Sequence, residues 1–182
     1  VSEGLVTDLV AAVGRWRGEL IDSTDSVAIR STATVNLAEG KTASQSSTTL
    51  GGDASRAVDG NVGSDYNDGS CTHTDAGSGE WWQVDLGSSM SIDHVMVVNV
   101  GGPNAVRFAG VEVRVSDTAM AGDNSAPPQG VACGPAFTSS QASLTSPITV
   151  QCDGKTGRYV ILRHTTGNHL IFCELEVYAV PP

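Results

Sequence analysis

Apolar residues recur at every second position in several stretches of this chain, and this spacing constrains the fold more than any other feature. Val111, Val113 and Val115 alternate with polar residues, and the stretch from Cys173 to Val177 has the same pattern. Successive side chains of a β-strand point to opposite faces, so each stretch predicts a strand with one buried and one solvated face. Further strands are expected at residues 82–86, 92–99, 148–152 and 159–163.

Turn-forming clusters separate these stretches. They include LGGDAS, GGPNA and GDNSAPPQG, which are rich in Gly, Pro, Asn, Asp and Ser. No helical period lies between the expected strands. Many short strands joined by turns are typical of an antiparallel sandwich, so we expect residues 36–182 to form one all-β domain.

The first 21 residues have a different period. Leu5, Leu9, Val13, Trp16 and Leu20 follow the spacing of one face of an amphipathic helix. Two glycines weaken this helix by about 1 kcal/mol each relative to alanine, so it needs a surface or sister helices. It either packs on the sandwich or associates with other copies as a stalk, which would give a homo-oligomer through residues 1–21. Residues 22–35 are interpreted as a linker.

Charge and hydropathy exclude several partners. The formal net charge of -10 disfavours phosphate backbones and anionic lipid surfaces, so nucleic acid is not an expected partner. Neither a signal peptide nor an apolar run long enough to span a bilayer is visible, so no membrane insertion is expected. Because the first residue is Val1, we expect a processed chain or an excised piece.

Four cysteines, with no C-x-x-C spacing, allow three disulfide pairings. Disulfides form in oxidising compartments, so the cysteines favour a secreted, extracellular or cell-surface protein. The alternative is four reduced, buried thiols in a cytosolic protein.

Signatures of catalysis are missing. The sequence contains no G-x-S-x-G elbow, no H-E-x-x-H and no phosphate-binding loop. The stretch DGNVGSDYNDGS suggests an EF-hand loop starting at Asp59, but Ser64 and Ser70 occupy the positions that need glycine and glutamate. His94, His164 and His169 have no spacing that converges on a metal. We therefore expect a binding module and not an enzyme.

Four segments occur in a fixed order: NLAEGKTASQSS, SRAVDGNVGSDYNDGSCTHT, EWWQVDLG and GRYVILRHTTGNHLIFCELEVY. In this order and spacing they resemble the F-type lectins (fucolectins), the fucose-binding group within the discoidin-like (coagulation factor C domain) sandwiches. The resemblance runs from about Asn36 to Tyr178. It implies an eight-stranded antiparallel jelly-roll β-sandwich of the galactose-binding-like kind, a structural calcium ion, and a shallow sugar site at one end of the barrel.

The resemblance assigns a calcium site to two distant segments. Ca²⁺ takes six to eight oxygen ligands, and the Asp/Asn/Gly-rich stretch 59–70 is a suitable loop. If the Cys173 side chain points inward to a disulfide, strand alternation turns Glu174 outward to a loop. The alternatives are an Asp59 that bonds its own backbone in a turn and a solvated Glu174. The implied ligands are side-chain oxygens of Asp59 and Glu174 and backbone oxygens of Arg56, Asn61, Ser70 and Cys173.

Two disulfides also follow from the resemblance. The family pairs the cysteine before the histidine with the one in the last strand, which implies Cys71–Cys173 and leaves Cys133–Cys152.

The sugar motif is where this sequence departs from the family. F-type lectins use a histidine, twenty-six residues, Arg-x-Asp, four residues, and Arg or Lys. His73 and Arg107 match, but Val100 and Gly102 replace the arginine and the aspartate. The resemblance implies that His73 and Arg107 donate hydrogen bonds to sugar hydroxyls. The expected sugar-binding residues are His73, Arg107, Tyr66 and Asn67.

Two functions remain open. The first is a calcium-stabilised extracellular lectin module that binds a glycan or glycoprotein of the fucose type with a degenerate motif. A hydrogen bond to a charged group contributes about 1.5 to 3 kcal/mol, so one missing cation lowers affinity by about one to two orders of magnitude. The second is a non-enzymatic protein-protein interaction module on the same sandwich, with sugar binding lost.

Overall fold

The structure is a computed structural model that describes residues 35–122, 124–125, 127–143 and 147–181. The helix predicted over residues 1–21, and the linker 22–35 apart from its last residue, lie outside the described residues. Among the described residues, no helix has both the length and the apolar character needed to cross a bilayer. The elements are β1 (Thr42–Gln45), η1 (Ala54–Val58), η2 (Tyr66–Asp68), β2 (Thr72–Ser78), β3 (Trp81–Asn99), η3 (Gly102–Phe108), β4 (Val111–Ser116), β5 (Val131–Ala132), α1 (Ser139–Ala142), β6 (Ile148–His164) and β7 (Gly167–Ala179).

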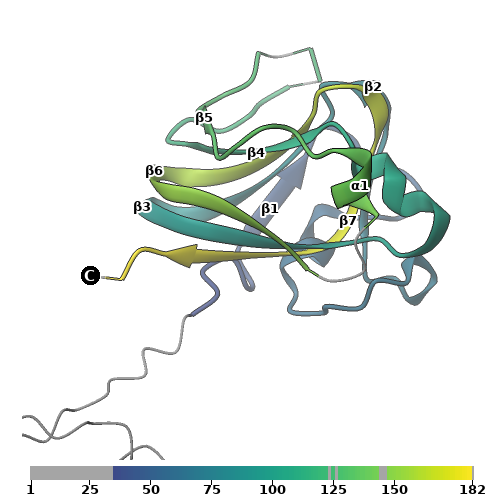
Figure 1. Cartoon of the computed structure of the whole chain (residues 1–182), viewed down its shortest axis with the longest axis horizontal. Coiled ribbons are helices and arrows are strands. Elements are labelled where there is room, and N and C mark those ends of the chain that lie inside the picture. The colour runs from purple at the N-terminus through teal and green to yellow at the C-terminus, as the bar shows by residue number, and fades with distance from the viewer. Residues whose placement is uncertain (1–34, 123, 126, 144–146, 182) are drawn as a thin grey trace, which may run out of the picture. The chain divides into compact units, whose positions relative to one another are not determined.

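Two long strands, β3 and β6, connect the layers of an antiparallel sandwich (Figure 1). The first part of β3 pairs with β1 and with the end of β6, which also pairs with β4. The last part of β3 pairs with β7 and with the start of β6. Register shifts between Asp85 and Met90, and between Ile92 and His94, interrupt the β3–β6 ladder where β3 passes from one layer to the other.

The all-β antiparallel sandwich expected from the sequence is therefore confirmed. Within the described residues it has seven strands in the order β2-β7-β3-β6-β4-β5, with β1 beside β3. The four strands predicted at 82–86, 92–99, 148–152 and 159–163 are halves of β3 and β6, because each pair of halves is one continuous strand.

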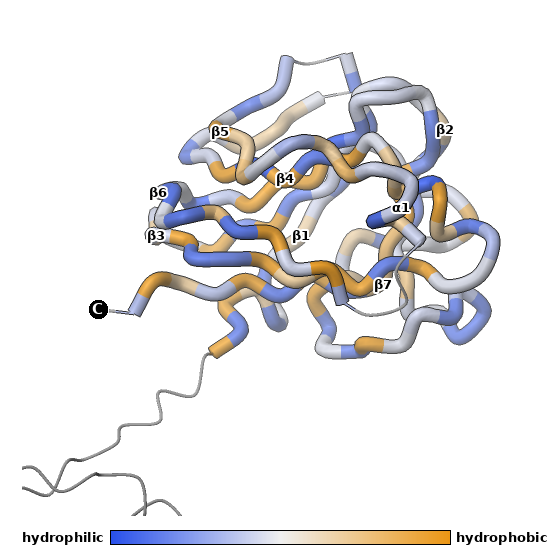
Figure 2. The backbone as a smooth tube through the Cα atoms, in the orientation of Figure 1, coloured by the Kyte–Doolittle hydropathy of each residue, from blue (hydrophilic) through white to orange (hydrophobic). Residues whose placement is uncertain are grey.

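One main core fills the space between the layers. Val95 and Val97 of one layer and Val113 and Leu162 of the other belong to a single cluster of buried side chains, and all four are at most 3% exposed. Hydrophobic and hydrophilic residues alternate along these strands (Figure 2). Trp82 belongs to this core, whereas its neighbour Trp81 packs on the opposite face in a small cluster with Met120 and Ile161. Both tryptophans are buried, because a loop covers the outer face at this point.

A β-bulge in β7 changes the alternation on which the sequence argument relied. Val98 of β3 pairs with Glu174, but the next residue, Asn99, pairs with Phe172, so Cys173 is an extra residue in β7. Phe172 and Leu175 both enter the main core. Strict alternation with Leu175 predicts that Cys173 also faces the main core. Cys173 instead belongs to a second small cluster with Cys71. Period-two alternation fails here because the inserted residue shifts the phase of the strand.

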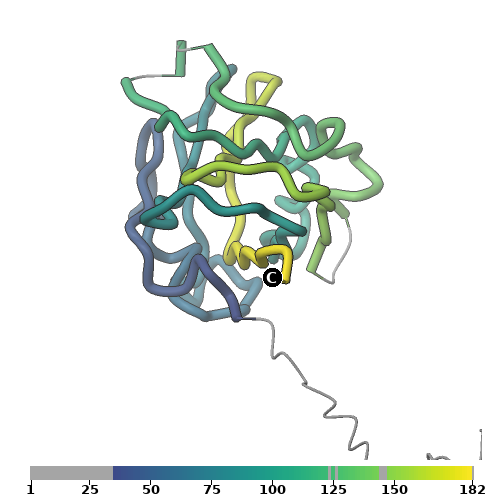
Figure 3. The backbone as a smooth tube through the Cα atoms, turned by 90° about the vertical axis from the view of Figure 1, so that its left-hand side faces the viewer, coloured from purple at the N-terminus to yellow at the C-terminus, as the bar shows by residue number. Residues whose placement is uncertain are grey.

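The short helices and long loops gather at one end of the sandwich. The first described residues lie beside the C-terminal strand at the other end, where the backbone N–H of Leu37 donates to the carbonyl of Val177. In the side view, the early purple-to-blue segments occupy one side and the green segment around α1 the other (Figure 3). η1, η2 and η3 therefore lie where they can form a recognition surface between strand ends.

Candidate functional site

His73 lies at the centre of a cluster of rings on β2. It pairs with Ile171 of β7, and its residue is only 4% exposed. His169, two residues before Ile171, packs against His73 with ring centroids 4.9 Å apart. Tyr66 of η2 approaches His73 edge-on at 5.4 Å. The pairing of β2 with β7 therefore brings together side chains that are almost a hundred positions apart.

Hydrogen bonds determine which nitrogen of His73 is available to a ligand. The Tyr66 hydroxyl donates to the carbonyl of Leu50 at 3.0 Å, so its oxygen can accept from Nδ1–H of His73 at 3.4 Å. Nε2 of His73 then carries the lone pair. This atom is buried and has no hydrogen-bond partner among the described residues. It can accept a hydrogen bond from a hydroxyl group.

The surroundings of His73 keep its ring neutral. Burial is the main cause, and the nearby His169 and Arg107 add to it, while Asp75 acts in the opposite direction. Together they lower the pKa of His73 from 6.5 to about 4. The site therefore combines a neutral acceptor with a cation, the guanidinium of Arg107.

Arg107 is placed by two buried side chains beneath η3. His164 accepts at Nδ1 from the backbone N–H of Thr166, so its Nε2–H donates to the carbonyl of Arg107 at 2.8 Å. Asn99 donates to the carbonyl of Ala105 at 3.0 Å. The short helix that carries Arg107 is thus fixed to β3 and β6, and Arg107 lies close enough to His73 to lower its pKa.

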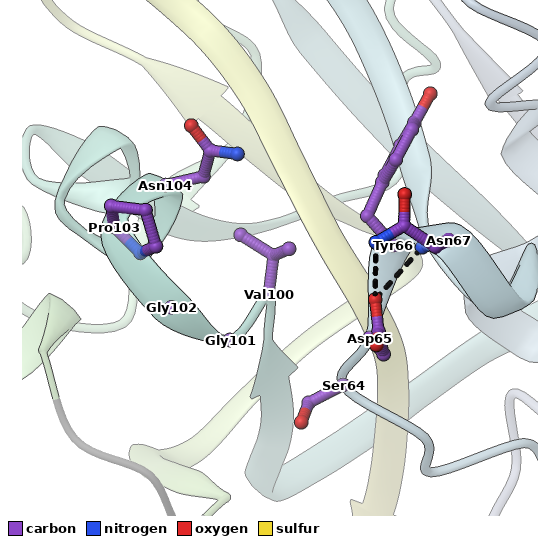
Figure 4. A pocket seen from close by; sticks show the side chains of 9 residues that line it. All are labelled: Ser64, Asp65, Tyr66, Asn67, Val100, Gly101, Gly102, Pro103 and Asn104. Carbon is purple, nitrogen blue, oxygen red and sulfur yellow. Dashed lines mark hydrogen bonds between the residues drawn. The ribbon is translucent and has the colours of Figure 1, made fainter.

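A pocket of about 430 Å³ lies beside this cluster, between η2 and the start of η3 (Figure 4). Val100 and Gly102, which stand at the family's arginine and aspartate positions, line it. Asn67 lines it from the other wall, and its side chain and backbone N–H both donate to Asp65. The nine lining residues are Ser64, Asp65, Tyr66, Asn67, Val100, Gly101, Gly102, Pro103 and Asn104.

Glu174 is a fully buried carboxylate next to the bulge. Its Oε1 accepts from the backbone N–H of Gly60 at 3.1 Å, and its Oε2 has no hydrogen-bond partner among the described residues. Burial raises the pKa of Glu174 to about 8, and the neighbouring carboxylates of Asp59 and Glu176 act in the same direction. A buried carboxylate is unfavourable unless a donor or a cation satisfies it.

The loop after η1 places Asp59 near Glu174. Asp59 Oδ1 accepts from the backbone N–H of Asn61 at 2.9 Å, which is the turn bond that the sequence left open as an alternative. The Ser70 hydroxyl donates to the carbonyl of Asp65, and Arg56 donates to the carbonyl of Cys71.

The described residues contain no group of three or more His, Cys, Asp or Glu side chains that could hold a metal. An ion at Glu174 and Asp59 would therefore need backbone oxygens as its remaining ligands, which Ca²⁺ accepts readily. The orphaned carboxylate oxygen and the carbonyl-rich loop fit such a hard cation.

Both implied disulfides are present. Cys71 is bonded to Cys173, and Cys133 to Cys152. The first bond joins the start of β2, two residues before His73, to the bulge beside Glu174. It therefore links the ring cluster to the carboxylate loop.

The structure brings some predicted residues together and adds others. Tyr66 contacts His73, and Arg107 lies within electrostatic range of it, whereas Asn67 faces the pocket. Sequence reasoning missed His169, because β2 was not recognised as a strand and its register with β7 was unknown. It also missed Ser64, which lines the pocket and is not part of the sugar motif, whereas the segment 103–106, which contains Asn104, was expected at the rim of the site.

Comparison with known proteins gives consistent matches. The family model described as NedA-like, galactose-binding domain, of the F5/F8 type C group, matches residues 56–162. A fucolectin of Anguilla anguilla is 31% identical over 71% of this chain and 78% of its own length. The lectin domain of lectinolysin, solved in complex with Lewis B antigen, has a TM-score of 0.68 and 37% identity over 81% of this chain and 99% of that domain. A pentraxin fusion protein of Xenopus laevis is 30% identical over 70% of this chain, which spans only 29% of that protein.

Proposed function

Because this chain belongs to the F-type lectins, within the F5/F8 type C (galactose-binding-like) domain family, we propose that it binds fucose-containing glycans or glycoproteins. The family consists of binding modules, so the chain is not an enzyme. The observation that carries the proposal is the buried, unpartnered Nε2 of His73 beside the charged Arg107.

The two residues have complementary tasks. His73 is neutral and offers a lone pair at Nε2, so it accepts a hydrogen bond from a sugar hydroxyl. This differs from the donor role that the resemblance implied for His73, because Nδ1–H is directed to Tyr66. Arg107 donates to a second oxygen of the sugar. Hydrogen bonds that involve an ion contribute about 1.5 to 3 kcal/mol each.

Val100 and Gly102 make the site weaker than the full motif. Without a second cation, affinity is expected to be about one to two orders of magnitude lower. The second candidate function, a protein interaction module with lost sugar binding, draws its support from these two positions. The choice between the two candidate functions depends on whether His73 and Arg107 can bind a sugar without a second cation.

A calcium ion is proposed between the 59–70 loop and β7. Glu174 and Asp59 would supply side-chain oxygens, with backbone oxygens from Arg56, Asn61, Ser70 and Cys173. The support is the buried Glu174 oxygen that has no other partner. A divalent ion would bind the ionised carboxylate of Glu174 and hold the 59–70 loop against β7.

An extracellular location is proposed from the two disulfides, which persist in oxidising compartments. Self-association through residues 1–21 remains a prediction. Several shallow sites on one assembly would raise avidity without any new contact. Sedimentation of the chain with and without residues 1–21 tests it, and identical monomer masses would rule it out.

A glycan array decides between lectin and interaction module. The chain, with calcium, should bind fucosylated glycans saturably, and His73→Ala or Arg107→Ala should weaken binding by at least about tenfold. His94→Ala and Arg158→Ala are matched controls, since these residues lie on β3 and β6 outside the cluster, and both should bind as the parent chain does. An empty array from a protein with an unchanged melting temperature would favour the interaction module.

A further inference from the structure

His73 and His169 are neighbours on one face of the β2–β7 ladder. His73 pairs with Ile171, and His169 lies two residues before Ile171, so the two histidine side chains point to the same face. Their ring centroids are 4.9 Å apart, and the ring planes make an angle of 61°. The two imidazoles are therefore in direct contact.

Hydrogen bonds fix the proton of each neutral ring on Nδ1. Nδ1 of His169 lies 3.0 Å from the carbonyl oxygen of Thr74, and because a carbonyl only accepts, this nitrogen carries the hydrogen. Nδ1–H of His73 is directed to the hydroxyl of Tyr66. Both Nε2 atoms then carry lone pairs. Neither has a hydrogen-bond partner among the described residues, and Nε2 of His73 is buried.

Histidines that bind metals have the same arrangement. A histidine that binds a metal through one ring nitrogen usually donates the hydrogen of the other nitrogen to an oxygen atom. His73 and His169 both do so, to Tyr66 and Thr74. Imidazole nitrogen is a preferred ligand of Zn²⁺ and Cu²⁺, whereas Ca²⁺ takes oxygen ligands. The histidine pair would therefore select a transition-metal ion over calcium.

The separation of the two rings fits a shared ion. A Zn²⁺–nitrogen bond of about 2.0 to 2.1 Å places the ion about 3.2 Å from the centre of each ring. Two ring centroids 4.9 Å apart then subtend about 100° at the ion, which is close to the tetrahedral angle. Because the described residues contain no cluster of three His, Cys, Asp or Glu ligands, water would complete the coordination.

The charges near His73 act on an ion in two directions. Arg107 lowers the pKa of His73 and would also repel a metal ion, whereas Asp75 acts in the opposite sense. The pKa of about 4 leaves His73 unprotonated at neutral pH, so no proton has to leave this ring before a metal binds. The formal net charge of -10 favours the approach of a cation.

We propose that Nε2 of His73 and Nε2 of His169 form a site for a transition-metal ion such as Zn²⁺, and that this ion and the sugar exclude each other. The metal site needs only the two rings. The exclusion rests on the proposed function, because the ion and the sugar hydroxyl would use the same lone pair of His73. Zinc would then act as an inhibitor of glycan binding.

Calorimetry with zinc chloride, at saturating calcium and on a chain without a polyhistidine tag, tests the metal site. The parent chain should bind one Zn²⁺. His73→Gln or His169→Gln should weaken this binding at least about tenfold, since even an outer-shell partner of a metal contributes that much. The matched control is His94→Gln, because His94 lies on β3 with its Nδ1 bonded to Asp93 at 2.7 Å. This variant should bind zinc as the parent chain does.

Imidazole NMR of the parent chain needs no variant. Zinc should shift the Nε2 signals of His73 and His169 and leave those of His94 in place. A chain that did not bind zinc, or that bound it with the signals of His73 and His169 unchanged, would overturn the metal site.

Methyl α-L-fucoside tests the exclusion. Zinc at about ten times its dissociation constant should lower the fucoside affinity of the parent chain about elevenfold, as simple competition requires. The same zinc concentration should lower that of His169→Gln at most about twofold. A parent chain whose fucoside affinity did not respond to bound zinc would overturn the exclusion. A folded chain that bound zinc at both histidines but no fucoside would overturn the proposed function and leave the metal site intact.

Discussion

At the scale of single residues, His73 shows how surroundings change the chemistry of a side chain. An imidazole with an ordinary pKa is partly charged near neutral pH and then donates from both nitrogens. Burial, His169 and Arg107 lower the pKa of His73 to about 4 against the opposing effect of Asp75. Its ring is therefore neutral and presents one donor to Tyr66 and one acceptor to a ligand.

The first prediction concerns pH. Sugar affinity at saturating calcium should change less than about twofold between pH 7.5 and pH 5, because His73 stays neutral over this range. A histidine with a pKa of 6.5 would instead lose about thirtyfold at pH 5. NMR titration of the imidazole nitrogens gives the pKa of His73 directly. A His73 midpoint near 6.5 would contradict the neutral-acceptor role.

His73 also links stability to pH. Its pKa is lower in the folded chain than the ordinary 6.5, so the unfolded chain binds more protons between pH 6.5 and about 4. The contribution of His73 to the free energy of unfolding is therefore complete above pH 6.5 and is lost as the pH falls to about 4. Replacement of His73 by glutamine should reduce the loss of free energy of unfolding between pH 6.5 and about 4.

At the scale of elements, the bulge and the disulfides decide what the strand ends display. Bulges re-aim side chains where strands approach functional sites. In β7 the inserted residue Cys173 is bonded to Cys71. Cys71 lies immediately before β2 and two residues before His73. The Cys133–Cys152 bond lies in the main core, away from His73. The two disulfides should therefore differ in their effect on binding.

The second prediction compares paired substitutions of the disulfides. Cys71→Ala with Cys173→Ala removes a link of sequence separation 102, and Cys133→Ala with Cys152→Ala removes one of separation 19. Loop entropy gives losses of about 5 and about 3 kcal/mol, so the first pair should melt at the lower temperature. Only the loss of Cys71–Cys173 should also weaken sugar binding. The sugar affinity is measured at a temperature below the melting temperatures of both variants. Equal weakening by the two pairs would contradict the assigned role of Cys71–Cys173.

At the scale of the whole molecule, the proposed calcium ion joins segments that are distant in the chain. The loop after η1 and the strand β7 meet at Gly60 and Glu174, more than a hundred residues apart in sequence. An ion that binds only the folded arrangement stabilises the entire domain by mass action. Its removal should therefore lower the melting temperature of the domain and not only loosen one loop.

The third prediction separates an ion site from a merely buried acid. Calcium should raise the melting temperature of the parent chain by several degrees over the chelated state, as about 2 kcal/mol of binding linkage would. Glu174→Gln should abolish this rise. In chelator it should melt no lower than the parent, because burial raises the pKa of Glu174 to about 8 and the carboxyl that the amide replaces is then largely neutral. Glu176→Gln, two positions away on the same strand, is the control and should keep the calcium response. If calcium did not change the melting temperature of the parent chain, the proposed ion site would be excluded.

The sequence determined the class of fold and the identity of the candidate residues. Alternation in 111–115 and 173–177 predicted strands, and the resemblance gave the disulfide pairs and the pairing of His73 with Arg107. These features are readable because local periodicity and motif spacing are properties of the chain itself.

Only the tertiary structure decided which side chains meet and in which state. The register of β2 with β7 placed His169 against His73, and the bulge at Cys173 removed that cysteine from the main core. The pocket arose because η2 and η3 come together at the Ser64–Gly101 hydrogen bond. Register, bulges and burial depend on contacts between distant segments, so period and spacing within one segment do not contain them.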